Sequence, residues 1–201
     1  HYANAATDVE YEFPFGFKEV EGIHSRTDFD LGNHQKFSGK KIQYFDTETG
    51  ESYVPYVVET SIGVDRMVLQ VLSASYEEQK LENGESRTVM HIPAALAPVK
   101  AAVLPLVKKD GLPEVARELM HSLKFDHNVQ YDEKDSIGKR YRRQDAIGTP
   151  FCITVDHQTL EDKTVTIRHR DSMEQQRVAI ADLAGIIGEE VSFRKLFAKL
   201  C

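Results

Sequence analysis

Residues 59–66, Glu-Thr-Ser-Ile-Gly-Val-Asp-Arg, place a carboxylate, a hydroxyl and a guanidinium close together in the chain. Hydrophobic periodicity predicts a strand over 53–60 and a helix over 64–80 on either side of this segment. A helix N-terminus offers free N–H groups and the positive end of its dipole, which suits an anionic ligand. Arg66 adds a cation that can hold two phosphate oxygens at once. The pattern alone also fits a capped helix with a surface arginine, so both interpretations stay open at this point.

Three segments resemble the homodimeric glycyl-tRNA synthetases, which are class II aminoacyl-tRNA synthetases. They are residues 13–16 (FPFG), 19–31 (EVEGIHSRTDFDL) and 59–66 (ETSIGVDR), in this order. The last of them is similar to motif 3, the strand–helix unit whose arginine holds the ATP phosphates. The rest of the chain resembles the anticodon-binding domain of the same enzymes, through residues 135–155 (DSIGKRYRRQDAIGTPFCITV) and 165–178 (VTIRHRDSMEQQRV).

The resemblance implies an α/β protein in two parts. Residues 1–94 would be the C-terminal part of a class II catalytic domain, a partial antiparallel sheet with the motif 3 helix. Residues 95–201 would be a three-layer α/β anticodon-binding domain with a mixed five-stranded sheet. A polar turn at Asn83-Gly84 and a new strand over 99–106 independently place the boundary near residue 95.

Alternating strands and helices are predicted after this boundary, as a three-layer domain requires. A helix begins near Asp110, the expected cap, with Pro113 in its first turn. The other predicted strands are 128–131, 151–155, 163–169 and 174–178. The other predicted helices are 136–146, 180–187 and 192–200.

The chemistry that the resemblance implies has two steps. Glycine reacts with ATP to give glycyl-adenylate and pyrophosphate, and the glycyl group then passes to glycine tRNA. The residues implied for ATP are Glu19, Val20, Gly63, Val64, Asp65 and Arg66, the last of them on the terminal phosphate. Those implied for glycine are Glu59, Thr60, Ser61, Ile62 and Gly63, with Glu21 behind them or else paired with Arg26. Mg²⁺ would enter with ATP, and its candidate ligands are Glu19 and Glu59.

A basic cluster in the second part is the candidate tRNA surface. It comprises Lys139, Arg140, Arg142 and Arg143 on one predicted helix, with Arg168 as a weaker candidate. For the cations, a solvated helix face fits the sequence equally well. For Tyr141 we favour packing inward beside Ile137 over stacking on a base. Arg168 and Arg170 are expected to be solvated on an edge strand.

Charge and composition agree with this division. Residues 1–94 carry 8 basic and 16 acidic side chains, a net charge of −8, whereas residues 95–201 carry 17 and 16, a net charge of +1. The second part can therefore approach a polyanion. No apolar run is long enough for a membrane span, so none is expected. Cys152 and Cys201 lie far apart and are expected as reduced thiols of a cytoplasmic protein.

The chain is expected to be the C-terminal part of a larger, homodimeric synthetase, because motifs 1 and 2 are not recognisable and no initiator Met precedes His1. Alone it should not charge tRNA. One alternative is a non-catalytic, synthetase-like accessory protein that binds nucleic acid, which the retention of Glu59, Ser61 and Arg66 disfavours. Another is a different class II synthetase with the same C-terminal domain, which residues 19–31 disfavour.

Overall fold

The computed structural model describes residues 2–81 and 84–198, which form parts of two compact units. Unit 1 is His1–Ser73 and unit 2 is Ala74–Cys201. The predicted domain boundary near residue 95 stays a prediction, because a compact unit need not coincide with a domain. Asn83, in the predicted turn before that boundary, lies outside the described residues.

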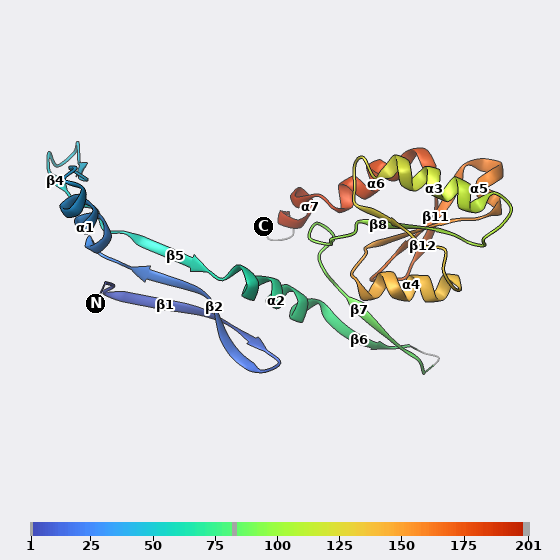
Figure 1. The fold of residues 1–201 in the computed structure, drawn as a ribbon, viewed down its shortest axis with the longest axis horizontal. Helices are drawn as coiled ribbons and strands as arrows, with labels where there is room; N and C mark the ends of the chain where they lie inside the picture. The colour runs from blue at the N-terminus through green and yellow to red at the C-terminus, as the bar shows by residue number, and fades with distance from the viewer. Residues whose placement is uncertain (1, 82–83, 199–201) are drawn as a thin grey trace. The chain divides into compact units, whose positions relative to one another are not determined.

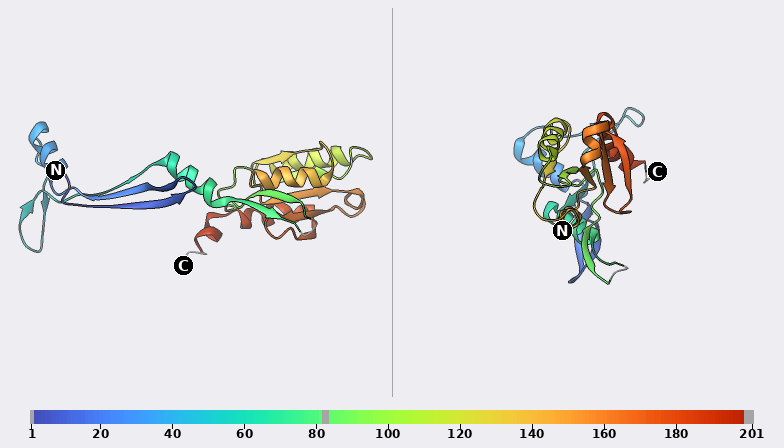
Figure 2. Two further views of the ribbon diagram at one scale, coloured as in Figure 1. Left: turned by 90° about the horizontal axis from the view of Figure 1, so that it is seen from below. Right: turned by 90° about the vertical axis from the view of Figure 1, so that its right-hand side faces the viewer.

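Unit 1 is built on a three-stranded antiparallel sheet in the order β1-β2-β5. Strands β1 and β2 form a long hairpin and run side by side in Figures 1 and 2. The expected antiparallel sheet followed by a helix is therefore present. The elements of unit 1 are β1 (Ala5–Phe13), β2 (Gly16–Ser25), α1 (Phe29–Ser38), β3 (Tyr44–Phe45), β4 (Ser52–Tyr53), β5 (Val58–Ile62) and most of α2 (Val64–Ser75).

A one-residue β-bulge at Val20 interrupts β2. Val9 of β1 pairs with Glu21 and the next residue, Glu10, pairs with Glu19, so Val20 is the extra residue. Residues that pair directly across an antiparallel sheet share a face. The bulge therefore places Glu19 on the same face as Gly22, whereas strict alternation would put it on the other face.

Unit 2 contains a hairpin and a mixed five-stranded sheet in the order β12-β11-β10-β8-β9. Strands β9, β8 and β10 are parallel, and β11 and β12 each run antiparallel to the preceding strand, so the sheet is mixed and five-stranded as the resemblance implied. The elements are β6 (Tyr76–Lys80), β7 (Ser86–Met90), β8 (Ala101–Pro105), α3 (Leu112–Leu123), β9 (Val129–Tyr131), α4 (Ile137–Ala146), β10 (Phe151–Val155), α5 (His157–Asp162), β11 (Thr164–His169), β12 (Gln175–Ala179), η1 (Ile180–Asp182), α6 (Leu183–Glu190) and α7 (Phe193–Phe197).

Helices cover both faces of this sheet, and Figure 1 shows α3 and α6 on one side and α4 on the other. Along β8, Ala101 and Val103 belong to the core beneath α3 and α6, and Ala102 and Leu104 belong to the core beneath α4. Alternate residues of one buried strand thus serve two cores. The three-layer prediction is confirmed.

Two predicted elements differ from the structure, a strand in unit 1 and a helix that was predicted to continue from unit 1 into unit 2. The helix predicted over 64–80 ends at Ser75, because Tyr76–Lys80 pairs with Ser86–Met90 as a hairpin. Tertiary pairing has overridden the helix propensity of this Glu- and Lys-containing segment. The strand predicted over 53–60 is replaced by β4 and β5, separated by residues 54–57.

In unit 2 most predicted elements lie within a few residues of their observed positions. The first helix starts after Gly111 rather than Asp110, and no side chain caps it, although Pro113 is in its first turn as predicted. Helix α5 was not predicted. It is held by a capping box in which the Asp156 side chain accepts from the Thr159 N–H. The predicted helix over 192–200 is α7, and residues 199–200 lie outside the described residues.

Cys152 on β10 gives a pH-dependent prediction. Its side chain is 1% exposed, and burial raises the pKa of the thiol to about 12. Because the thiolate is disfavoured in the folded state, this residue's contribution to stability is complete below pH 9 and is lost as the pH rises toward 12. At pH 8 we expect the peptide containing Cys152 to resist alkylation until denaturant is added, as measured by mass spectrometry. Rapid labelling of Cys152 without denaturant would contradict this burial. Cys201 lies outside the described residues.

Candidate functional site

The strongest candidate site lies in unit 1, where β5 ends and α2 begins. Residues 61–66, together with Glu19 and Val20, line an open pocket of about 440 Å³. The six residues implied for ATP therefore lie around one pocket, with Ser61 and Ile62 beside them. The N-terminus of the twelve-residue helix α2 contributes its free N–H groups to the same place.

The bulge at Val20 connects β2 to the start of α2 through two successive carbonyl groups. The Glu19 carbonyl accepts a hydrogen bond from Arg66 Nη1 at 2.5 Å, and the Val20 carbonyl accepts from the Gly63 N–H at 3.4 Å. Arg66 is exposed and has no carboxylate ion-pair partner among the described residues. Its guanidinium is therefore oriented by backbone and retains donors for an anion.

The residues implied for glycine divide between the two faces of the sheet. In the register of β2 with β5, Glu59 lies opposite His24, Ser61 opposite Gly22, and Ile62 opposite Glu21. Since side chains alternate along a strand, Glu59 and Ser61 share one face. Thr60, Ile62 and Glu21 belong to the other face, so Glu21 lies behind the first pair.

Glu59 is held by neighbouring side chains. Arg26 Nη1 donates to Glu59 Oε1 at 3.2 Å, and His24 Nδ1 lies 3.4 Å from the same oxygen. Arg26 also forms a bidentate ion pair with Asp30, in the first turn of α1. This hydrogen bond raises the pKa of Arg26 above its usual range and lowers the pKa of Asp30. In the described part of the chain Arg26 therefore pairs with Asp30 and Glu59, and the alternative pair with Glu21 is absent.

The carboxylates at this site suit a metal ion that brings most of its own ligands. Within residues 2–81 and 84–198, no three His, Cys, Asp or Glu side chains group closely enough to hold a metal ion. An ion that arrives with phosphates needs only one or two protein carboxylates. Glu19 is exposed at the pocket and suits this role, whereas Glu59 is not one of the residues that line the pocket.

Two of the five residues predicted for tRNA are buried in unit 2. Arg140 is 3% exposed and donates to the carbonyl groups of Pro105, Leu106 and Asp132. Arg168 is 5% exposed and makes a bidentate ion pair with Asp145. These contacts give both residues a structural role, so the tRNA-binding prediction now rests on the remaining three.

Lys139 and Arg142 are exposed on α4, and Arg142 pairs with Glu85. Arg143 is partly exposed and donates to Asp132 and Asp135. Tyr141 packs inward with Ile137, as favoured from the sequence, and its hydroxyl lies 2.7 Å from that of Thr154.

A buried ion-pair network was missed by sequence reasoning. Asp145 on α4 is 1% exposed, and its carboxylate accepts from Arg168 on β11 and from Arg87 on β7. Arg170 is also buried and donates to the carbonyls of Ile92 and Gly148. The expectation that Arg168 and Arg170 are solvated on an edge strand is wrong, because Arg168 is on β11 inside the sheet and Arg170 is buried just after that strand ends.

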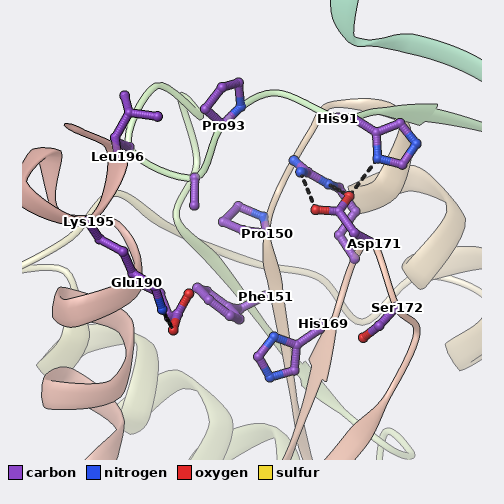
Figure 3. Close-up of a pocket in the computed structure, with 13 residues that line it drawn as sticks. His91, Pro93, Pro150, Phe151, His169, Asp171, Ser172, Glu190, Lys195 and Leu196 are labelled. Atoms are coloured by element: carbon purple, nitrogen blue, oxygen red, sulfur yellow. Dashed lines mark hydrogen bonds and ion pairs between the residues drawn. The ribbon is translucent and has the colours of Figure 1, made fainter. Parts of the chain in front are cut away.

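A second pocket, of about 460 Å³, opens in unit 2 (Figure 3). Its charged side chains are already paired with one another or with their neighbours. Asp171 bonds to Arg170 and to His91, and Lys195 pairs with Glu190. Because these charges neutralise each other, the residues of this pocket do not indicate which kind of ligand would bind there. The site in unit 1 remains the stronger candidate.

Known proteins are similar to this chain in both units. Residues 100–190 match the family model described as "Anticodon binding domain". The chain is 52% identical to a glycine–tRNA ligase from Borrelia hermsii over 193 residues, which is 95% of this chain and 43% of the relative. It is 53% identical to the glycine–tRNA ligases from Chlorobaculum tepidum and Clostridium beijerinckii, and covers 40% and 41% of them.

The chain thus spans about two fifths of the length of the curated relatives that it matches. In the described part of the chain, no helix has the length and apolar character needed to cross a membrane. Residues 100–190 thus match the anticodon binding domain family, and nearly the whole chain is similar to part of the glycine–tRNA ligases.

Proposed function

We propose that this chain is part of a glycine–tRNA ligase and carries a portion of the ATP and glycine site together with the anticodon-binding module. The observation that carries the proposal is the identity of 52–53% with glycine–tRNA ligases over 95% of the chain. The pocket shared by Ser61 and Arg66 supports it, as does the position of Glu59 on the same sheet face as Ser61. Residues 1–94 would belong to the catalytic domain and residues 95–201 to the anticodon-binding domain.

In this proposal the pocket at the start of α2 holds ATP. Arg66 and the helix N-terminus neutralise the terminal phosphates, and Gly63 to Asp65 leave the backbone open to them. Mg²⁺ bound to the phosphates supplies further charge neutralisation, with Glu19 as its protein ligand. Such phosphoryl chemistry depends on positioning, so fixing Arg66 to the Glu19 carbonyl prepares the site before ATP arrives.

Glycine would lie on the face that carries Glu59 and Ser61, where these two side chains receive its ammonium group. Gly22, directly opposite Ser61, leaves this face without a side chain at that point. A Cβ atom on Gly22 would lie 2.9 Å from His24 Cε1, so no larger residue fits without rearrangement. A substrate without a side chain must be selected by excluding larger ones, and steric overlap achieves this.

Glycine tRNA would contact unit 2 on the edge where the parallel strands β9, β8 and β10 end. Ligands of open α/β sheets bind outside the carboxyl ends of the strands. Lys108 and Lys109 follow β8 and are exposed, and Lys139 is exposed in the first turn of the nearby helix α4.

The full-length protein would be a cytoplasmic homodimer, and this chain alone would not charge tRNA. A non-catalytic accessory protein that binds nucleic acid is the alternative.

Binding of the purified chain to a glycine tRNA transcript tests the proposal. At fixed salt we expect a clear loss of affinity when the anticodon cytosines are replaced, measured by fluorescence anisotropy. Lys139→Ala should weaken binding to both transcripts and reduce the slope of log affinity against log salt by about 1. Lys36→Ala, the same change on α1 in unit 1, is the matched control and should leave binding unchanged.

Two other results would contradict parts of the proposal. Equal affinity for both transcripts, with a steep salt dependence, would mean that only the phosphate backbone is recognised and would contradict anticodon reading. If the full-length protein catalyses no glycine-dependent pyrophosphate exchange, the accessory-protein alternative replaces the enzyme.

A further inference from the structure

We infer that Arg26, anchored by Asp30, is a positioning residue for the glycine-binding carboxylate Glu59. This inference rests on the proposed function, because it assumes that Glu59 receives the substrate ammonium. Arg26 lies outside the pocket residues and is not expected to touch substrate. Its role would be to fix the orientation of a side chain that does.

The contacts of Glu59 are divided unequally between its two oxygens. Oε1 lies 3.2 Å from Arg26 Nη1 and 3.4 Å from His24 Nδ1, and Oε2 has no hydrogen-bond or ion-pair partner among the described residues. Of the two neighbours, only Arg26 donates a hydrogen bond, since His24 Nδ1 is buried without one. Arg26 thus fixes one oxygen and leaves the other available to an ammonium group.

Arg26 is itself immobilised from two other sides. Its Nε and Nη2 atoms donate to the two carboxylate oxygens of Asp30, and its guanidinium lies 4.6 Å from the centre of the Tyr2 ring. A planar guanidinium can bond Asp30 with one edge and Glu59 with another atom, which a lysine ammonium on a flexible stem cannot reproduce. The Asp30 pair also keeps Arg26 from turning fully onto Glu59 and covering both of its oxygens.

Arg26→Lys and Asp30→Asn in the full-length protein test this inference. We expect each change to raise the glycine KM about tenfold in glycine-dependent pyrophosphate exchange, because a small displacement of a binding group has a large effect. The ATP KM should change less than twofold, since Arg66 and Glu19 are untouched. Asp46→Asn is the matched control, because the Asp46 carboxylate accepts from the backbone N–H groups of Glu48 and Thr49 in the β3–β4 hairpin.

Glu59→Gln distinguishes a failure of the positioning role of Arg26 from a failure of the proposed glycine site. If Glu59→Gln raises the glycine KM while Arg26→Lys and Asp30→Asn leave it unchanged, the positioning role is wrong and the proposed glycine site stands. If Glu59→Gln also leaves the glycine KM unchanged, the glycine assignment in the proposed function fails first. Equal increases in the KM of glycine and of ATP would indicate a general structural role for Arg26 and would overturn the inference.

Discussion

Replacing Asp145 by alanine is expected to lower the free energy of unfolding of unit 2 by about 3–5 kcal/mol. The substitution leaves the guanidinium groups of Arg87 and Arg168, both at most 5% exposed, without their shared carboxylate. An uncompensated buried charge is costly because neither water nor another carboxylate can replace the lost partner. We would measure this by guanidinium chloride denaturation, with hydrogen exchange of β10 peptides reporting on unit 2.

A matched control separates burial from charge. Asp182 is exposed at the end of η1, and Asp182→Ala should change stability by less than about 0.5 kcal/mol. Replacing the three network residues together (Arg87→Met, Arg168→Met and Asp145→Leu) should recover most of the loss, since the network then leaves no unpaired charge buried. A loss below about 1 kcal/mol for Asp145→Ala would contradict the buried network.

Arg66→Ala is expected to reduce kcat/KM for glycine-dependent pyrophosphate exchange by about 10²–10³-fold in the full-length protein. The reason is that the proposed terminal-phosphate contact comes from a guanidinium already oriented by the Glu19 carbonyl. Arg66→Lys should restore only part of the activity, because it keeps the charge and loses the bidentate geometry.

Lys18→Ala is the control for Arg66, because Lys18 is an exposed cation on the neighbouring strand β2. It should leave the rate within twofold of the parent. Circular dichroism of the Arg66 variants should match the parent, which excludes unfolding as the cause. A decrease of less than threefold for Arg66→Ala would remove Arg66 from the ATP site.

The fold of unit 2 was largely predictable, because local signals and tertiary structure agree there. The run 151–155 is apolar except for Thr154 and forms the buried strand β10 with the predicted bounds. Ser136 is the N-cap of α4, next to where the helix was predicted to begin. The segment 76–80 was predicted incorrectly, since its strand state depends on pairing with 86–90 rather than on its own composition.

The sequence predicted most of the residues that meet at the candidate pocket and only part of its geometry, and their roles in binding stay predictions. Motif resemblance identified Glu59, Ser61 and Arg66, yet the bulge at Val20 has no sequence signal that a single chain reveals. The sequence also did not predict the burial of Arg140 and Arg168. A basic helix face looks solvated until its partners are known, and Asp145 lies 23 residues from Arg168 in the sequence.

The long sequence separation within the Asp145 network has a consequence for synthesis on the ribosome. Arg87 on β7 precedes its carboxylate partner by 58 residues, and Arg168 is made later still. At roughly 5–20 residues per second, Arg87 waits about 3–12 s for Asp145 to be translated. The Arg87 side chain can therefore form its ion pair only after the residues of α4 have been made, whereas the strands of the β1–β2–β5 sheet are all made once residue 62 has been added.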